Sequence, residues 1–258
     1  MKFLGDWEQI LNNKSEKILD NIESSSFTLA QSDLFRHEIK YYINSVDYKI
    51  LSTRLNTTLQ RDSAADKNGN YTIRSLYFDD LYDSSVKEKI DGINERKKYR
   101  IRIYNNSPKQ IKLECKQKVN RYIHKRSVEI SKEIYDQLLQ GNPTPLLSLG
   151  HPLANEMYLK YRCDFLRPKV IVEYVREAFV YPSENTRITF DKSLKTSYEN
   201  YNLFDEFTPM YSAFDDPSTI VLEVKFNNYL PIHIQRLIQL GRATQSAISK
   251  YCICRKYE

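Results

Sequence analysis

Several short segments of this sequence alternate charged with apolar residues, and most of the charges are cations. Charged residues fall at every second position in 36–40 and in 100–102, and the longer segment 112–118 has the same spacing. Segments 187–191 and 223–225 repeat it. Successive side chains of a β-strand point to opposite sides, so each segment would carry one ionic face and one largely apolar face. Lysine and arginine at this spacing are suited to binding an anion.

An antiparallel sheet with one solvated side would explain any one of these segments. It explains all five less well, because surface strands usually mix lysine and glutamate with threonine, serine and glutamine. Like charges at this density repel one another unless an anion lies between them. The repetition therefore favours a charged face that surrounds an anionic ligand.

The distribution of charge points to the same class of ligand. The chain has 39 Lys and Arg against 33 Asp and Glu, a net charge of +6. Between Arg96 and Lys132, thirteen Lys or Arg stand against two carboxylates, Glu114 and Glu129. A polyanion is the expected partner, and nucleic acid, an anionic membrane surface and phosphate chains are the candidates.

Composition excludes several other classes of protein. With 41% hydrophobic and 12% aromatic residues, the 258-residue chain can form a sizeable core. Apolar runs such as 170–172 are short, so no membrane span is expected, and the N-terminus lacks the apolar stretch of a secretory signal. The four cysteines form no CxxC pair, which indicates reduced thiols and no zinc site. A cytoplasmic protein is expected.

Hydrophobic periodicity predicts the elements that position the charges. An amphipathic helix over 7–22 places a helical extension at 1–30, before a domain spanning 31–258. Strands are predicted at 36–43, 73–79, 97–104, 110–118, 121–130, 169–181, 187–191 and 219–226. Helices are predicted at 45–59, 84–94, 131–139, 154–165, 232–240 and 246–254. Strands and helices do not alternate, so the expected class is α+β with a mostly antiparallel sheet.

Eight strands suit a closed antiparallel barrel. If the apolar strand faces pointed inward, the apolar helices at 45–59 and 154–165 would have little to pack against. The opposite arrangement lets helices cover an apolar exterior while the charged faces line the lumen. We therefore predict an eight-stranded antiparallel β-barrel that forms a basic tunnel covered by helices.

Eight motifs along the chain carry a resemblance to a known family. In order they are RHEIKY at 36–41, RSLYFD at 74–79, KYRIRIY at 98–104, LECK at 113–116, YVREAF at 174–179, RITFD at 187–191, LEVK at 222–225 and SKY at 249–251. Together they resemble the VTC domain, the catalytic domain of vacuolar transporter chaperone polyphosphate polymerases. This domain is a branch of the triphosphate tunnel metalloenzymes, which include the CYTH-type triphosphatases. The resemblance covers about 34 to 254.

The resemblance implies a tunnel that binds the triphosphate of ATP and transfers its γ-phosphate to a growing inorganic polyphosphate chain. Carried over by motif, the residues expected to handle the reacting phosphates are Lys40, Arg100, Arg102, Lys116, Arg176, Arg187 and Lys250. Other residues, from the motifs or from the alternation, are expected to bind phosphate: Arg36, Arg74, Lys112, Lys118, Lys125, Tyr174, Lys225 and Ser249. A shift of one residue along its strand would give the role of Lys125 to Arg126. Glu223 is the expected principal ligand of Mn²⁺ or Mg²⁺, with Glu38 and Glu114 as further oxygen ligands. Salt bridges to neighbouring lysines are the alternative for Glu38 and Glu114.

Phosphoryl transfer needs positioned reactants and positive charge more than covalent chemistry, and no Ser-His-Asp set is evident. The same tunnel could instead hydrolyse triphosphate, or bind polyphosphate without turnover. Nucleic-acid binding is disfavoured because the basic residues alternate with core positions and form no helix face with stacking aromatics. We expect a stand-alone domain without a phosphate-sensing helical domain or transmembrane helices beside it, in which case coupling to membrane translocation would need a separate membrane partner.

Overall fold

The computed structural model describes residues 37–120, 122–239 and 244–256. The chain divides into two units, 1–34 and 35–258, and the description below concerns the second. The predicted extension at 1–30 and the candidate residue Arg36 lie outside the described residues.

The described residues form one antiparallel sheet in which every pair of neighbouring strands is antiparallel. Its main strands, in spatial order, are β1 (His37–Ile43), β10 (Ile220–Phe226), β8 (Thr186–Ser197), β7 (Arg167–Tyr181), β3 (Asn70–Asp79), β4 (Glu95–Tyr104), β5 (Ser107–Val119) and β6 (Tyr122–Ile130). Two short strands were not predicted: β2 (Gln60–Arg61) pairs with β7, and β9 (Tyr211–Ser212) pairs with β8. The predicted α+β class is confirmed.

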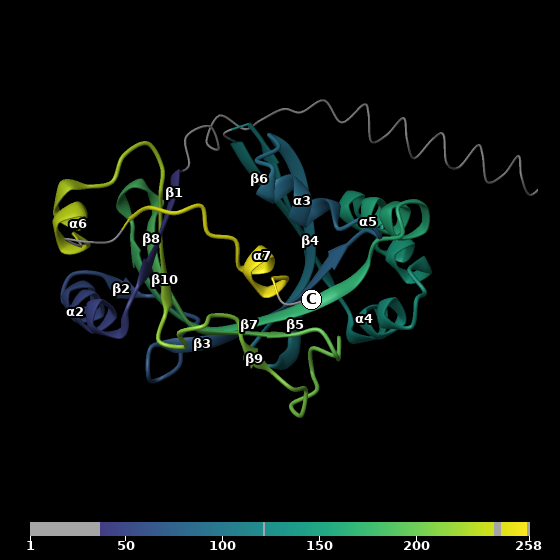
Figure 1. The fold of residues 1–258 in the computed structure, drawn as a ribbon, viewed down its shortest axis with the longest axis horizontal. Helices are drawn as coiled ribbons and strands as arrows, with labels where there is room; N and C mark the ends of the chain where they lie inside the picture. The colour runs from purple at the N-terminus through teal and green to yellow at the C-terminus, as the bar shows by residue number, and fades with distance from the viewer. Residues whose placement is uncertain (1–36, 121, 240–243, 257–258) are drawn as a thin grey trace, which may run out of the picture. The chain divides into compact units, whose positions relative to one another are not determined.

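The sheet is curled but its two end strands do not pair with each other. In Figure 1, β1 and β6 rise on opposite sides of the curl. The prediction of a barrel closed by backbone hydrogen bonds is therefore not met within the described residues. Side chains nevertheless span the opening, because Lys116 Nζ on β5 lies 3.2 Å from Glu38 Oε2 on β1.

Six helices in the described part of the chain follow the predicted positions. They are α2 (Ser45–Asn56), α3 (Ser84–Ile90), α4 (Lys132–Leu139), α5 (Pro152–Cys163), α6 (Ile232–Leu237) and α7 (Lys250–Cys254). Side-chain caps fix where four of them begin. The side-chain amide oxygen of Asn44 accepts from two backbone N–H groups of α2. Ser131, His151 and Ser249 each accept from one backbone N–H group, at the start of α4, α5 and α7 respectively.

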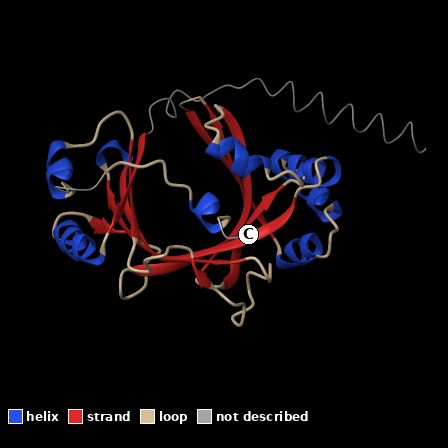
Figure 2. Ribbon diagram, viewed as in Figure 1, coloured by secondary structure: helices blue, strands red, loops and turns tan. Residues whose placement is uncertain are grey.

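Helices cover the convex side of the sheet, as the charge pattern predicted (Figure 2). Buried side chains of α4 and α5 pack on the apolar residues of β3, β4 and β5, among them Ile101 and Leu113. On the other wall, Leu51 and Leu55 of α2 pack with the outward residues of β8 and β10. Burial of this apolar area is the main source of stability for the curled sheet.

The concave side has an apolar floor that α7 covers. Tyr251 of α7 is buried with Ile73, Val172 and other floor residues, and its ring stacks on Tyr77 at 4.8 Å between centroids. The Tyr251 hydroxyl donates to Asp79 Oδ2 at 2.7 Å, which anchors α7 to β3. Within 37–120, 122–239 and 244–256, no helix combines the length and apolar character needed to cross a bilayer.

Candidate functional site on the concave face

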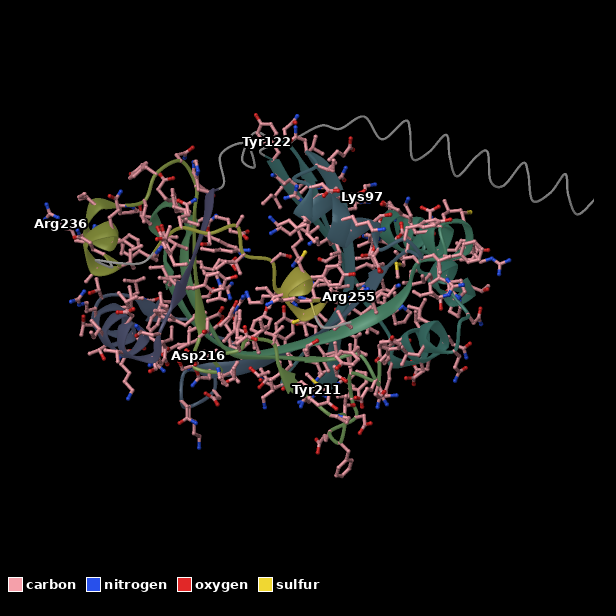
Figure 3. All side chains as sticks on the ribbon, in the orientation of Figure 1. Lys97, Tyr122, Tyr211, Asp216, Arg236 and Arg255 are labelled. Atoms are coloured by element: carbon pink, nitrogen blue, oxygen red, sulfur yellow. The ribbon has the colours of Figure 1, made fainter. Side chains whose placement is uncertain are left out.

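The strand register places one ionic row of each charged segment on the concave face. On β4 and β5, Arg100 is opposite Glu114, and Lys98 is opposite Lys116, which in turn is opposite Lys125 of β6. The intervening residues of β4 and β5 lie in the convex core. Figure 3 shows side chains of both walls pointing toward the concave side.

The opposite wall contributes a second ionic group. Lys40 of β1 is opposite Glu223 of β10, and Glu38 is opposite Lys225. Lys40 Nζ lies 2.7 Å from Glu38 Oε1, and Lys225 Nζ lies 2.5 Å from Glu223 Oε1. Lys40 and Lys116 hold Glu38 between the two walls.

Asp191 of β8 is fully buried and organises the cations beneath α7. Arg176 of β7 donates to both of its oxygens, at 2.6 and 2.8 Å, and Lys250 of α7 forms a further ion pair. Burial alone would raise the pKa of Asp191, but Arg176 and Lys250 outweigh it and hold the pKa at about 2. A permanent carboxylate therefore keeps Arg176 and Lys250 charged and in place.

Glu114 plays the same part on the other wall. Arg100 grips one oxygen through Nε and Nη2, each at 2.7 Å, while Lys125 pairs with the other oxygen. Arg102 Nη1 is 3.8 Å away. Burial opposes ionisation, yet Arg100, Arg102 and Lys125 lower the pKa of Glu114 to about 2.

The three glutamates predicted as metal ligands do not gather into one cluster. No group of three or more His, Cys, Asp or Glu side chains able to hold a metal forms among the described residues. Glu114 pairs with Arg100 and Lys125. Glu38 and Glu223, by contrast, influence each other. Burial and Glu223 raise the pKa of Glu38, but Lys116 and Lys40 outweigh them and lower this pKa to about 2. Glu38 and Glu223 therefore offer two neighbouring ionised carboxylates. Mg²⁺ is usually bound by one or two protein carboxylates when substrate phosphates supply further oxygen ligands.

Arg74 is the predicted site residue that the structure removes from the set. Its register partners on β4 and β7, Ile103 and Glu173, point to the convex side. Arg74 Nη2 lies 2.6 Å from Glu173 Oε2, and Nη1 donates to the carbonyls of Leu203 and Asp205. It holds the loop after β8 and cannot reach the concave face.

The alternative between Lys125 and Arg126 is decided by the same alternation. Lys125 pairs with Glu114 on the concave face, whereas Arg126 pairs with Glu156 of α5 on the convex side at 2.5 Å. Lys125 therefore stays with the candidate set and Arg126 does not.

The remaining predicted residues are near the site in different ways. Arg187 is at one end of the concave face and pairs with Asp62 and the Tyr71 hydroxyl. The Tyr174 hydroxyl accepts from Arg102 Nη2 at 3.4 Å. Register places two further lysines on this face, Lys112 opposite Arg102 and Lys118 opposite Arg96.

Sequence reasoning missed two contributors to the concave face. Lys98 donates to Ser249 Oγ at 3.1 Å, and the Tyr77 hydroxyl accepts from Arg100 Nη1 at 2.9 Å. Lys98 lies two residues before Arg100, so the alternation that selected Arg100 and Arg102 also selects it. No pattern identified Tyr77, because an aromatic residue in a strand is expected to belong to the apolar core.

Comparison with solved structures finds proteins similar to this chain. A putative adenylyl cyclase from Hippeastrum, described as revealing a dominant triphosphatase activity, matches with a TM-score of 0.51 at 14% identity, over 86% of this chain and 95% of that chain. A putative adenylate cyclase from Bacillus halodurans matches with a TM-score of 0.42 at 14% identity, over 74% of this chain and 82% of that chain. At 14% identity, the likeness to the Hippeastrum protein shows a shared fold.

No curated protein matches the chain. The sequence model of the VTC domain matches residues 35–257, almost the whole chain, and so confirms the resemblance carried by the eight motifs. The chain belongs to the VTC domain family.

Proposed function

We propose that this protein is a phosphotransferase that adds the γ-phosphate of ATP to a growing inorganic polyphosphate chain on the concave face. The observation that carries the proposal is the convergence of cations from both walls of the sheet and from α7 on one face, where Lys116 and Glu38 meet across the opening. A triphosphate bound there would contact lysine and arginine on several sides. Membership of the VTC domain family supports the same reaction.

The ion pairs of the site divide into two kinds. Those of Asp191 are buried and hold Arg176 and Lys250 in fixed positions. By contrast, the Lys125 side chain is 49% exposed, and Lys116 is also partly exposed. Exposed ion pairs contribute little free energy, so these lysines can exchange a carboxylate for a phosphate at low cost.

This division suits a processive transfer of phosphoryl groups. Arginines held by buried carboxylates present fixed forks to non-bridging oxygens, and so stabilise charge that develops during transfer. Lysines are flexible point charges, which can follow a chain as it moves. The face therefore offers both a rigid centre, at Arg100, Arg102 and Arg176, and mobile contacts around it.

Mn²⁺ or Mg²⁺ fits the donor set of Glu38 and Glu223, which offers oxygen ligands and no sulfur or imidazole. A bound ion would neutralise charge on phosphate oxygens. Glu223→Gln is expected to raise the Mn²⁺ concentration needed for half-maximal tripolyphosphate binding, as measured by calorimetry across a metal titration. Glu114→Gln is the comparison, and an equal effect there would contradict the assignment of Glu223.

The decisive experiment incubates the protein with ATP and Mn²⁺ and separates the products by length on a gel. Long chains together with ADP are expected. Release of orthophosphate without chains would instead assign a triphosphatase, the second candidate, which the likeness to the Hippeastrum protein favours because that protein is described as having a dominant triphosphatase activity. Binding without either product would contradict both.

The affinity for tripolyphosphate is expected to fall as the pH rises through about 8. The residues packed around the partly exposed Lys116 side chain reduce its hydration and lower its pKa to about 8; Glu38 opposes this, and Lys40 adds to it. Above that pH the amine is neutral and loses its attraction for phosphate. Dissociation constants across this range would test the prediction. Lys116→Arg keeps the charge, so an unchanged pH profile in that variant would contradict it.

Lys125→Gln and Arg126→Gln form a matched pair on opposite sides of β6. Lys125→Gln is expected to weaken tripolyphosphate binding by about tenfold, the effect of one charge-assisted contact. Arg126→Gln is expected to leave binding unchanged and to lower stability, because Glu156 loses its closest cation. Calorimetry and thermal unfolding would measure both, and the reverse result would show that β6 presents its other side.

A further inference from the structure

Four cations gather at the end of the sheet where β4 begins and β5 ends. They are Lys89 of α3, Arg96 and Lys98 of β4, and Lys118 of β5, and we call them the α3–β4 cation cluster. Arg96 is directly opposite Lys118, and Lys98 is directly opposite Lys116. Like charges at opposed positions destabilise a sheet, so two such pairs in succession need a compensating cause.

Glu38 pairs with Lys116, but carboxylates do not supply that compensation to the four cations of the cluster. Across 37–120, 122–239 and 244–256, none of the four cations has an Asp or Glu oxygen within ion-pair distance. Lys98 donates to Ser249 Oγ and lies 3.6 Å from Cys252 Sγ, while Arg96 donates to the Ile93 carbonyl. Glu88 of α3 interacts electrostatically with Arg96 but forms no ion pair with it. Lys40, Arg100, Lys116 and Arg176 of the central site, by contrast, each have a carboxylate partner.

Burial and, to a smaller extent, repulsion within the cluster lower the pKa of two of its lysines. Partial burial, followed by Arg96 and Lys98, lowers the pKa of Lys89, and Lys118 adds to the effect. Burial likewise lowers the pKa of Lys98; Cys252 and Tyr77 oppose this, and Arg96 adds a smaller lowering. An anion placed among these groups would relieve this repulsion.

The cluster is continuous with the central site. Lys98 lies two residues before Arg100 on the same face of β4, a separation of about 7 Å at the usual rise per strand residue. Helix α3 packs beside α7 and the first residues of β4 (Figure 1). A phosphate chain leaving the central arginines along β4 would therefore pass Lys98 and Lys118 and then reach Arg96 and Lys89.

We propose that the α3–β4 cation cluster binds the phosphates of an inorganic polyphosphate chain that extend beyond the triphosphate held at the central arginines. This inference rests on the proposed function and adds where the chain lies and why a long chain binds better than a nucleotide. A nucleic acid fits the cluster less well, because the cluster contains no aromatic side chain on which a base could stack. The aromatics beside it, Tyr77 and Tyr251, are buried and stacked on each other.

The test compares long-chain polyphosphate with tripolyphosphate by calorimetry at several salt concentrations. In the wild type the long chain is expected to bind more tightly. In the double variant Lys89→Gln/Arg96→Gln its affinity should fall by roughly tenfold or more, and the slope of log affinity against log salt should fall by about two, one for each lost contact. The change for tripolyphosphate should be much smaller.

Two further variants make the result specific. Lys132→Gln/Lys160→Gln removes the same charge from α4 and α5 on the convex side and should retain the preference for the long chain. Lys89→Arg/Arg96→Lys keeps the charges and should also retain it. Removing like charges should not lower the thermal unfolding temperature, so loss of binding in a folded double variant can be attributed to the cluster.

Three outcomes would overturn the inference: unchanged long-chain affinity in the double variant, an equal loss for tripolyphosphate, or competition by single-stranded RNA as strong as that by polyphosphate at equal phosphate concentration. Binding is measured without turnover, so its result is separate from that of the product assay. If ATP gives no chains and the double variant still loses long-chain binding, the polymerase proposal fails and the cluster remains a polyphosphate-binding site.

Discussion

Arg102→Ala is expected to lower kcat/KM for ATP by about 10²- to 10³-fold, the effect of losing one preorganised donor to the transition state. Arg102 is buried on the concave face, and its guanidinium contacts the hydroxyls of Ser75 and Tyr174. Its ion pair with Glu114 is long, at 3.8 Å, so most of its hydrogen-bonding capacity is free for a phosphate. Steady-state kinetics with ATP and Mn²⁺ would measure the loss.

The fold should survive this substitution, because Glu114 keeps Arg100 and Lys125 as partners. Arg74→Ala is the matched control: it removes an equally buried arginine from the neighbouring strand, but from the convex side. It should lower stability by freeing Glu173 and the loop carbonyls, while the folded fraction keeps its kcat/KM. A larger kinetic loss for Arg74→Ala than for Arg102→Ala would place the reaction on the convex side of the sheet and contradict the proposal.

The contrast between these two arginines also shows what the sequence could predict. Alternation identified the ionic face of β1, β4, β5, β8 and β10 because their other face is apolar and belongs to the convex core. On β3 the signal is reversed. Its concave residues include Tyr71, Ile73 and Tyr77, which form the floor under α7, and Arg74 is the polar residue facing outward. Arg74 faces outward because its ion-pair partner, Glu173, lies on the convex side, and that partner is far away in the sequence.

The closure of the sheet and the choice of ionic partners could not be predicted from the sequence, for a related reason. Whether β1 pairs with β6 depends on the total curl of the sheet, to which no single segment contributes a recognisable pattern. Glu223 was predicted as a metal ligand from its motif, and Glu38 and Glu114 from the type of their side chains, yet Glu114 pairs with arginine and lysine instead. Side chains from strands far apart in sequence decide these pairings, and a local pattern does not contain them.

The largest effect on stability is expected for Asp191→Asn. The substitution leaves Arg176 buried without its carboxylate partner and Lys250 with only the longer contact to Glu223 at 4.0 Å. Breaking a buried ion pair in this way costs about 3–5 kcal/mol of unfolding free energy. Total stabilities of about 5–15 kcal/mol make that a large fraction. Urea unfolding monitored by circular dichroism near neutral pH would measure it. Asp136→Asn, which disrupts the exposed pair with Lys132, should change stability by no more than about 0.5 kcal/mol.

The pH dependence of this difference separates loss of charge from loss of packing. Folding lowers the pKa of Asp191 from 3.8 to about 2, because Arg176 and Lys250 outweigh the effect of burial. Its stabilisation is therefore fully present above the unfolded pKa and is lost as the pH falls through the folded value. The gap between wild type and Asp191→Asn should be constant from neutral pH to about pH 5 and should shrink at lower pH. A gap that stays constant throughout would mean that the amide disturbs packing and that the charge of Asp191 is not what holds Arg176 of β7 and Lys250 of α7 in place.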